Sequence, residues 1–201
     1  MKAKRLEVIL GTGLRIGPAE MVQRFQRLRD NRMLPTSRGR NAEDLTTEGI
    51  VFGLLSVVDE RPGFAALTAK TLGYLQPVGG VAGSFAEASS LRQALITTIE
   101  NQALLDSIRE IRLTNSEIYT NSFGRSAIFY SAERTENVTY YVEKTAITLL
   151  QRGAKQAYDP RAQISSMIRE IVIYPRVLKD IVKEIRDRET YAQALASNDA
   201  A

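Results

Sequence analysis

The chain has 201 residues, of which 44% are hydrophobic and 25% are charged, and its formal net charge is +4. This composition is ordinary for a globular protein with one good-sized core, or with two small domains that share one. Cysteine and histidine are both absent, which excludes disulfides, zinc sites built on thiolate or imidazole, and Ser-His-Asp or Cys-His catalysis. We therefore expect neither an enzyme nor a cofactor.

The positive charge is concentrated at one end of the chain. Residues 1–40 carry ten basic and three acidic side chains, a net charge of +7, so residues 41–201 carry −3. A local positive field of this kind attracts polyanions, and a block of like charge is a sign of an interaction surface. The residues that we expect to contact phosphates are Lys2, Lys4, Arg5, Arg15, Arg24, Arg27, Arg29, Arg38 and Arg40.

The first residues do not have the pattern of a signal peptide. They are basic and then apolar, but the apolar stretch is short and is interrupted by glycine and arginine. The chain also has no apolar run of the length that a membrane span requires. We therefore expect a cytoplasmic protein with no membrane partner.

The first third of the chain predicts a strand followed by helices. Residues 7–10 have the composition of a short strand, and the glycine-rich turn 11–17 follows it. Its spacing is not that of a dinucleotide-binding site, and no second strand follows, so we interpret it as a tight turn. Apolar residues at helical spacing predict an amphipathic helix over 18–33. Further helices are expected over 42–58 and 62–75.

The clearest break in the chain is the proline- and glycine-rich segment 77–83. It is either an exposed loop or a linker between a basic helical unit, residues 1–76, and a second unit, residues 84–201. Ser84 could cap a long helix after this break, with Glu87 three positions later as its capping-box partner.

The second half of the chain changes from helical to strand patterning and back. β-Branched and aromatic residues between 108 and 132 predict two or three antiparallel strands. Residues 138–152 and 162–196 predict helices, the second one interrupted at Pro175. The apolar stripes Ile164–Val172 and Leu178–Ile185 suit either internal packing or a homodimer. The predicted fold class is mainly α with a small antiparallel β-hairpin or three-stranded sheet.

The basic N-terminal helix, a turn bounded by Pro35 and a following helix are compatible with a helix-turn-helix-like unit. The segments 27–30, 34–35, 38–42 and 45–46 resemble small uncharacterised proteins of bacterial prophages, in which a basic helix, an R-G-R-x-A loop and an L-T helix start recur near the N-terminus. The resemblance implies an origin in a phage or mobile element.

We therefore expect a nucleic-acid-binding protein of phage or mobile-element type, such as a transcriptional regulator, with DNA as the favoured partner. Two alternatives stay open. The first is a phage counter-defence inhibitor or adaptor whose basic face meets an acidic surface of a host protein complex. The second is a structural protein of phage assembly, in which the long apolar helices would serve self-association.

Overall fold

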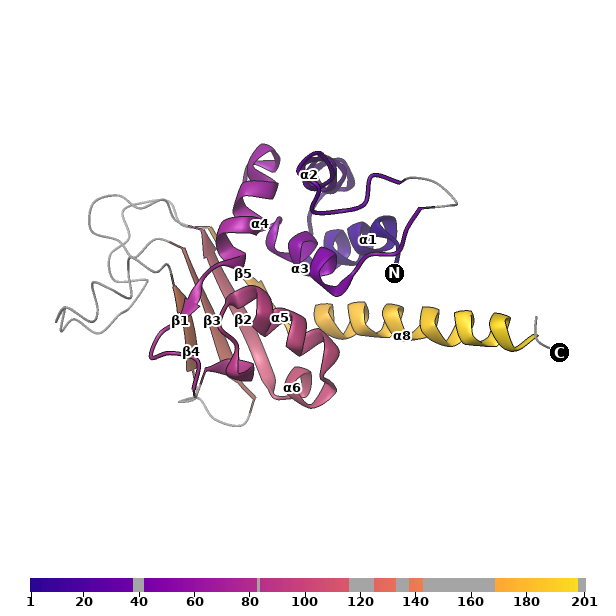
Figure 1. Cartoon of the computed structure of the whole chain (residues 1–201). Coiled ribbons are helices and arrows are strands. Elements are labelled where there is room, and N and C mark those ends of the chain that lie inside the picture. Colours follow the sequence, from indigo (N-terminus) through magenta and orange to yellow (C-terminus); the bar gives the residue numbers. More distant parts are fainter. Residues whose placement is uncertain (38–41, 83, 116–124, 133–137, 143–168, 199–201) are drawn as a thin grey trace.

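The structure is a computed structural model that describes residues 1–37, 42–82, 84–115, 125–132, 138–142 and 169–198 (Figure 1). Helices lie on one side of a five-stranded antiparallel sheet, so the fold is mixed α and β. The α-helices are α1 (Ala3–Leu14), α2 (Pro18–Asp30), α3 (Thr47–Leu55), α4 (Ala65–Gly73), α5 (Leu91–Glu100), α6 (Gln102–Asp106) and α8 (Pro175–Asn198). The strands are β1 (Gln76–Pro77), β2 (Ile108–Asn115), β3 (Ser126–Ser131), β4 (Val138–Val142) and β5 (Arg169–Ile173).

The predicted N-terminal strand is wrong, because residues 7–10 belong to helix α1. Leu6 and Leu10 are both buried and lie four positions apart, which places them on the same face of a helix. Gly13 also lies within α1, and a Cβ atom there would lie only 2.9 Å from Val177 Cγ2 of α8. Gly13 therefore permits close packing of α1 against α8, and the turn is limited to the residues between Leu14 and Pro18.

Helix α2 begins at Pro18 and ends at Asp30, close to the predicted bounds. Helix α3 begins only after Thr46, whose side chain accepts a hydrogen bond from the backbone N–H of Gly49 at 3.1 Å. The connection between α2 and α3 therefore runs from residue 31 to residue 46. Helix-turn-helix motifs join their helices by three or four residues, so this pair does not have that geometry.

The helix predicted after the glycine-rich break starts later than expected. Ser84 precedes a short 3₁₀ helix, η3 (Phe85–Glu87), and does not cap α5. The N-cap of α5 is Ser90, which accepts a hydrogen bond from the N–H of Gln93 at 3.2 Å. A second cap at Asn101 starts α6 without an intervening loop.

The strands lie in the order β1-β4-β3-β2-β5, and all neighbours are antiparallel. Alternate residues of the strands face the helices and are buried, and the register sets Ile111 opposite both Phe129 and Ile173. Tyr141 lies on the same face, where its hydroxyl donates to the carbonyl oxygen of Phe85 at 2.8 Å. The antiparallel pair expected between residues 108 and 132 is confirmed as β2 and β3.

The sheet is larger than predicted because two segments expected to be helical are strands. Residues 138–142 form β4, and residues 169–173 form β5. Ile171 and Val172 are therefore consecutive residues of a strand, which point to opposite faces of the sheet. The rest of the predicted helix 138–152 and of the stripe Ile164–Val172 lies outside the described residues.

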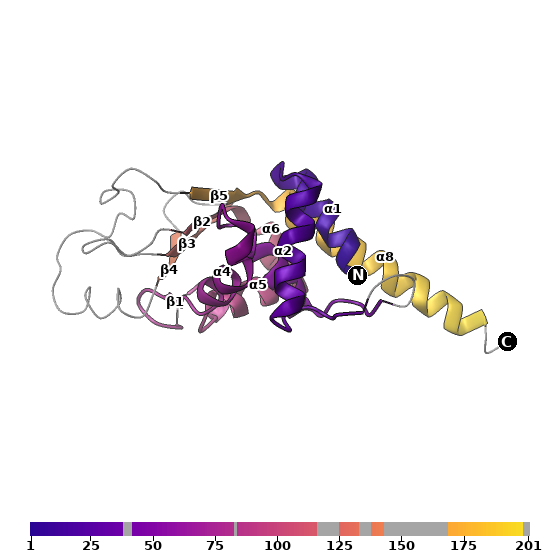
Figure 2. The ribbon, with the colours of Figure 1, turned by 90° about the horizontal axis from the view of Figure 1, so that it is seen from above.

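Helix α8 begins at Pro175 and crosses the other helices before it extends beyond them (Figures 1 and 2). The stripe predicted in this segment is confirmed, because Leu178, Ile181 and Val182 are buried and Ile185 packs against the core. Residues 189–194 are exposed, so the last turns of α8 project away from the body of the molecule.

One buried apolar cluster includes residues from α1 through α8 and from the inner face of the sheet, so the helices and the sheet share one core.

Strand β1 pairs with β4. Pro77, the first residue of the proline- and glycine-rich segment 77–83, therefore belongs to the sheet. None of the helices in the described ranges has both the length and the apolar character needed to cross a membrane.

Candidate functional site

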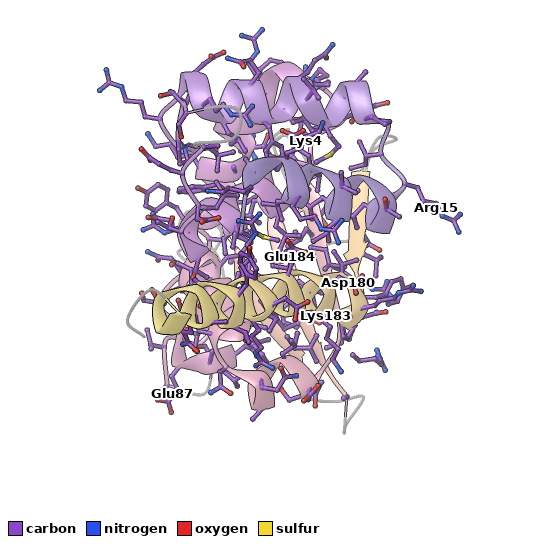
Figure 3. The ribbon with its side chains drawn as sticks, turned by 90° about the vertical axis from the view of Figure 1, so that its right-hand side faces the viewer. Lys4, Arg15, Glu87, Asp180, Lys183 and Glu184 are labelled. Carbon is purple, nitrogen blue, oxygen red and sulfur yellow. The ribbon has the colours of Figure 1, made fainter. Side chains whose placement is uncertain are left out.

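Helices α1 and α2 form an antiparallel hairpin that divides the predicted basic residues between its two ends. An ion pair of 3.3 Å between Arg29 and Glu7 joins the second half of α2 to the first half of α1. Arg15 lies at the other end of α1, where it is exposed and has a left-handed backbone conformation. Figure 3 shows Arg15 projecting from the molecule far from Lys4. The predicted residues therefore do not form one continuous surface.

Arg24 is fully buried, with an exposed fraction of 0%. Its Nε donates to Glu20 Oε1 at 3.0 Å, and its two terminal nitrogens donate to the carbonyl oxygens of Ser56 and Glu60 at 2.7 and 3.1 Å. These bonds connect α2 to the segment between α3 and α4. The assignment of Arg24 to a phosphate-binding surface is corrected, because a guanidinium in the protein interior does not reach a polyanion.

Several of the other predicted cations have a carboxylate partner within the fold. Lys4 Nζ lies 3.1 Å from Glu7, the same buried residue that pairs with Arg29. Arg27 lies 3.7 Å from Asp30 on α2. Arg27 and Asp30 are both largely exposed, and exposed pairs of this kind contribute little free energy. Arg27 can therefore exchange its partner for an external anion. Lys4 is exposed although its partner Glu7 is buried, and the largely buried Arg29 is held in place.

A cluster of ion pairs surrounds Asp44, shortly before α3. Its carboxylate lies 3.3 Å from Lys2 Nζ, 3.1 Å from a terminal nitrogen of Arg188 and 3.4 Å from the N-terminal ammonium group of Met1. A second carboxylate, Glu184, lies close by on α8. The chain thus brings its first residues, the end of the α2–α3 connection and α8 together around one acidic group.

Glu184 links α8 to α1. Its carboxylate lies 2.9 Å from Arg5 Nε and 3.5 Å from Arg188 Nε, and Figure 3 shows it on the side of α8 that faces α1. We call the first turn of α1, the end of α2, residues 42–45 and the middle of α8 the basic end of the molecule. Figures 1 and 2 both show these parts on the side of the helices away from the sheet.

The base of the α2–α3 connection is held by polar contacts at the basic end. The backbone N–H of Glu43 donates to Ser37 Oγ at 2.9 Å, and Lys2 Nζ donates to the carbonyl oxygen of Ala42. Residues 38–41 join these two points and contain Arg38 and Arg40, which lie outside the described residues. Their predicted role in phosphate contact therefore stays a prediction.

Arg32, which the sequence patterns did not single out, lies at the start of this connection. It is exposed and has a left-handed backbone conformation, with φ of 59°. No acidic side chain in the described ranges pairs with it. Its guanidinium is therefore free to bind an anion that approaches the basic end.

The cations at the basic end keep Asp44 ionised. Partial burial would raise the pKa of this carboxyl, but the N-terminal ammonium and Lys2 outweigh it and hold the pKa below its ordinary value of 3.8. Asp44 is therefore negatively charged throughout the physiological pH range. Asp44 forms ion pairs with Lys2, Arg188 and the N-terminal ammonium group at once. Its single negative charge therefore neutralises only part of their positive charge.

The sequence patterns missed the α8 contribution to this site. Arg188 and Asp44 are 144 positions apart in the chain, and Arg5 and Glu184 are 179 positions apart. Neither pair can be recognised from neighbouring residues in the sequence, because only the path of α8 across the other helices brings these residues together. The described residues hold no cluster of three side chains suited to a metal ion.

Comparison of the chain with protein-family models, with curated proteins and with solved structures found no match.

Proposed function

We propose that the protein binds nucleic acid, with phosphates held at the basic end and by the Arg38–Arg40 segment. The observation that carries this proposal is the convergence of Lys2, Arg5 and Arg188, from both ends of the chain, at the base of the connection that contains Arg38 and Arg40. Two of these cations share Asp44, so the carboxylates do not balance the charge.

The surrounding residues support the same function. Arg32 has no acidic partner in the described ranges, Arg27 is in an exposed pair that an anion can replace, and the ammonium group of Lys4 is exposed. Phosphate contacts supply most of the affinity of sequence-independent nucleic-acid binding. A DNA-binding regulator of phage or mobile-element type is the specific role that we propose, in line with the resemblance of this same segment to prophage proteins.

The test is the salt dependence of binding to fluorescent random-sequence DNA, with protein freed of nucleic acid by nuclease. If three or four phosphates are neutralised, the logarithm of the binding constant for duplex DNA should fall against that of salt with a slope of about −3. Replacing Arg38 and Arg40 together by alanine should weaken binding to all sequences and reduce the slope by about two.

Arg15→Ala is the control, because Arg15 is an exposed arginine that lies at the far end of α1. Its replacement should leave both affinity and slope nearly unchanged. An effect of Arg15→Ala that is as large per charge removed as that of the double variant would mean that total charge alone drives binding and would refute the basic end as the site. Absence of binding at low salt would refute nucleic-acid binding altogether.

The projecting half of α8 favours a second candidate, an adaptor or assembly protein that pairs through this helix with another protein or a second copy. Residues 189–194 are exposed on all sides over almost two turns, and an isolated helix of that length is marginally stable in water. Sedimentation equilibrium without nucleic acid distinguishes the two candidates. A dimer that dissociates when the chain is ended at Arg188 would support pairing through α8.

A further inference from the structure

A small pocket opens between the start of the α2–α3 connection and helices α3, α4 and α5. Its lining consists of Met33, Phe52, Lys70, Gly73, Tyr74 and Arg92, and its volume is about 150 Å³. An apolar cavity of about this volume is known to take one benzene ring. The pocket therefore has room for one flat ring.

The lining residues give the pocket an apolar floor and an aromatic wall. Met33 and Phe52 are half-buried, and Gly73 leaves space because it has no side chain. Tyr74 stands at the rim with 59% of its surface exposed, and the guanidinium of Arg92 lies 5.5 Å from the centre of its ring. An exposed aromatic ring beside an arginine is the arrangement on which a planar group stacks.

The rim carries one positive charge without a partner. Arg92 is paired with Glu48 at 2.7 Å, whereas Lys70 is exposed and has no acidic partner within the described part of the chain. A ligand that stacks on Tyr74 and also pairs with Lys70 combines a flat ring with an adjacent negative charge. An unstacked nucleotide has this chemistry, since its base is planar and its phosphate is anionic.

The position of the pocket connects it to the basic end. Met33, one of its walls, directly follows the unpaired Arg32, and its backbone N–H donates to the carbonyl oxygen of Leu28 at the end of α2. The connection that leads to Arg38 and Arg40 thus begins at the pocket. Arg32 is thus adjacent in the chain to a residue that lines the pocket.

We propose that this pocket takes one unstacked base of a single-stranded nucleic acid, with an adjacent phosphate on Lys70. The inference rests on the proposed function and adds a preference for single strands. Bases in a duplex are paired and stacked, so they do not enter a pocket of this kind without first being unstacked. Tyr74 and Met33 would enclose the base, while Arg32 holds the backbone beside it.

The first experiment compares a fluorescent single strand of mixed sequence with the duplex of the same sequence. Tyr74→Ala should weaken binding of the single strand about fivefold or more, in keeping with the loss of one stacked base, and should change duplex binding less than twofold. Tyr74→Phe should retain the wild-type affinity because it keeps the ring. Tyr191→Ala is the matched control, since Tyr191 is exposed on α8.

Equal losses for single strand and duplex, or no loss with Tyr74→Ala, would overturn the inference. These outcomes leave the proposed function intact as long as the Arg38 and Arg40 variant still loses affinity for both forms. If neither form binds to the wild-type protein, the proposed function fails together with the inference. The two failures are therefore distinguishable within one set of measurements.

A second readout follows the methionine methyl groups by NMR in protein labelled with ¹³C-methyl methionine. Addition of the single strand should shift the signal of Met33, assigned through Met33→Leu, because a base in the pocket lies against it. Met21 is buried in the core and should stay unchanged as the internal reference. A Met33 signal that does not move at saturation would refute occupation of the pocket.

Discussion

Arginine residues that are neighbours in the sequence have different environments in the fold. Arg24 and Arg27 are three positions apart on α2, yet Arg24 is buried and Arg27 is exposed. A count of charged residues along the sequence cannot distinguish the buried Arg24 from the exposed Arg27. The difference follows from the phase of the helix, because Arg24 shares the inward side with Met21, Phe25 and Leu28.

Replacement of Arg24 by alanine should destabilise the protein by about 3 kcal/mol, because it removes a buried guanidinium and leaves the buried carbonyl oxygen of Ser56 without this donor and Glu20 without its partner. Urea unfolding followed by circular dichroism measures this change. Arg27→Ala is the matched control on the same helix, and we expect a change below about 0.5 kcal/mol because its ion pair is exposed. Similar losses for both variants would contradict the structural role assigned to Arg24.

At the scale of the element, two errors of prediction concern short apolar segments. Residues 7–10 were expected to form a strand and are part of α1, whereas residues 138–142 were expected to begin a helix over 138–152 and form β4. Short apolar runs do not distinguish a helix from a strand by periodicity alone. Longer segments with a clear helical period, such as α2 and the first half of α8, were predicted correctly.

Helix α3 approaches α1 closely at Gly53. A Cβ atom there would lie 2.8 Å from Leu6 Cδ2 and 3.2 Å from Phe25 Cζ, and both neighbours are fully buried. Gly53→Ala should therefore destabilise the protein by about 1 kcal/mol, since the overpacking exceeds the gain in helix propensity.

Thermal unfolding measures the effect of this change in packing. Gly63→Ala serves as the control, because nothing lies within 4 Å of a Cβ atom at Gly63. A higher melting temperature for Gly53→Ala than for the wild type would contradict this prediction, because it would show that α1 and α3 can move apart without loss of stability.

At the scale of the whole molecule, ion pairs connect segments that are far apart in the chain. Asp44 joins the first residues, the α2–α3 connection and α8. Its pKa is lowered in the folded state, so the stability that it contributes is present above its unfolded-state value of 3.8 and is lost as the pH falls through the lower folded-state value.

Asp44→Asn should cost roughly 0.5 kcal/mol at pH 7, a small amount because Asp44 is about half exposed. The difference from the wild type should shrink when the pH is lowered below 3.8. Urea unfolding over a pH series measures it. Glu43→Gln is the control, since this neighbouring carboxylate has no ion pair in the described ranges, and a constant difference at all pH values would contradict the role of the Asp44 charge.

The sequence by itself determined the properties that depend on local spacing. It predicted the predominance of helices, the stripe of α8, the β2–β3 pair and the concentration of basic residues near the N-terminus, because amphipathic periodicity and charge are readable within a few turns. Only the tertiary structure decided which arginines are buried, that β5 joins the sheet and that Arg188 meets Asp44. It also formed the pocket from Met33, Phe52, Tyr74 and Arg92. These features require contacts between segments distant in sequence, and such contacts are selected by the packing of the whole core, not by any local pattern.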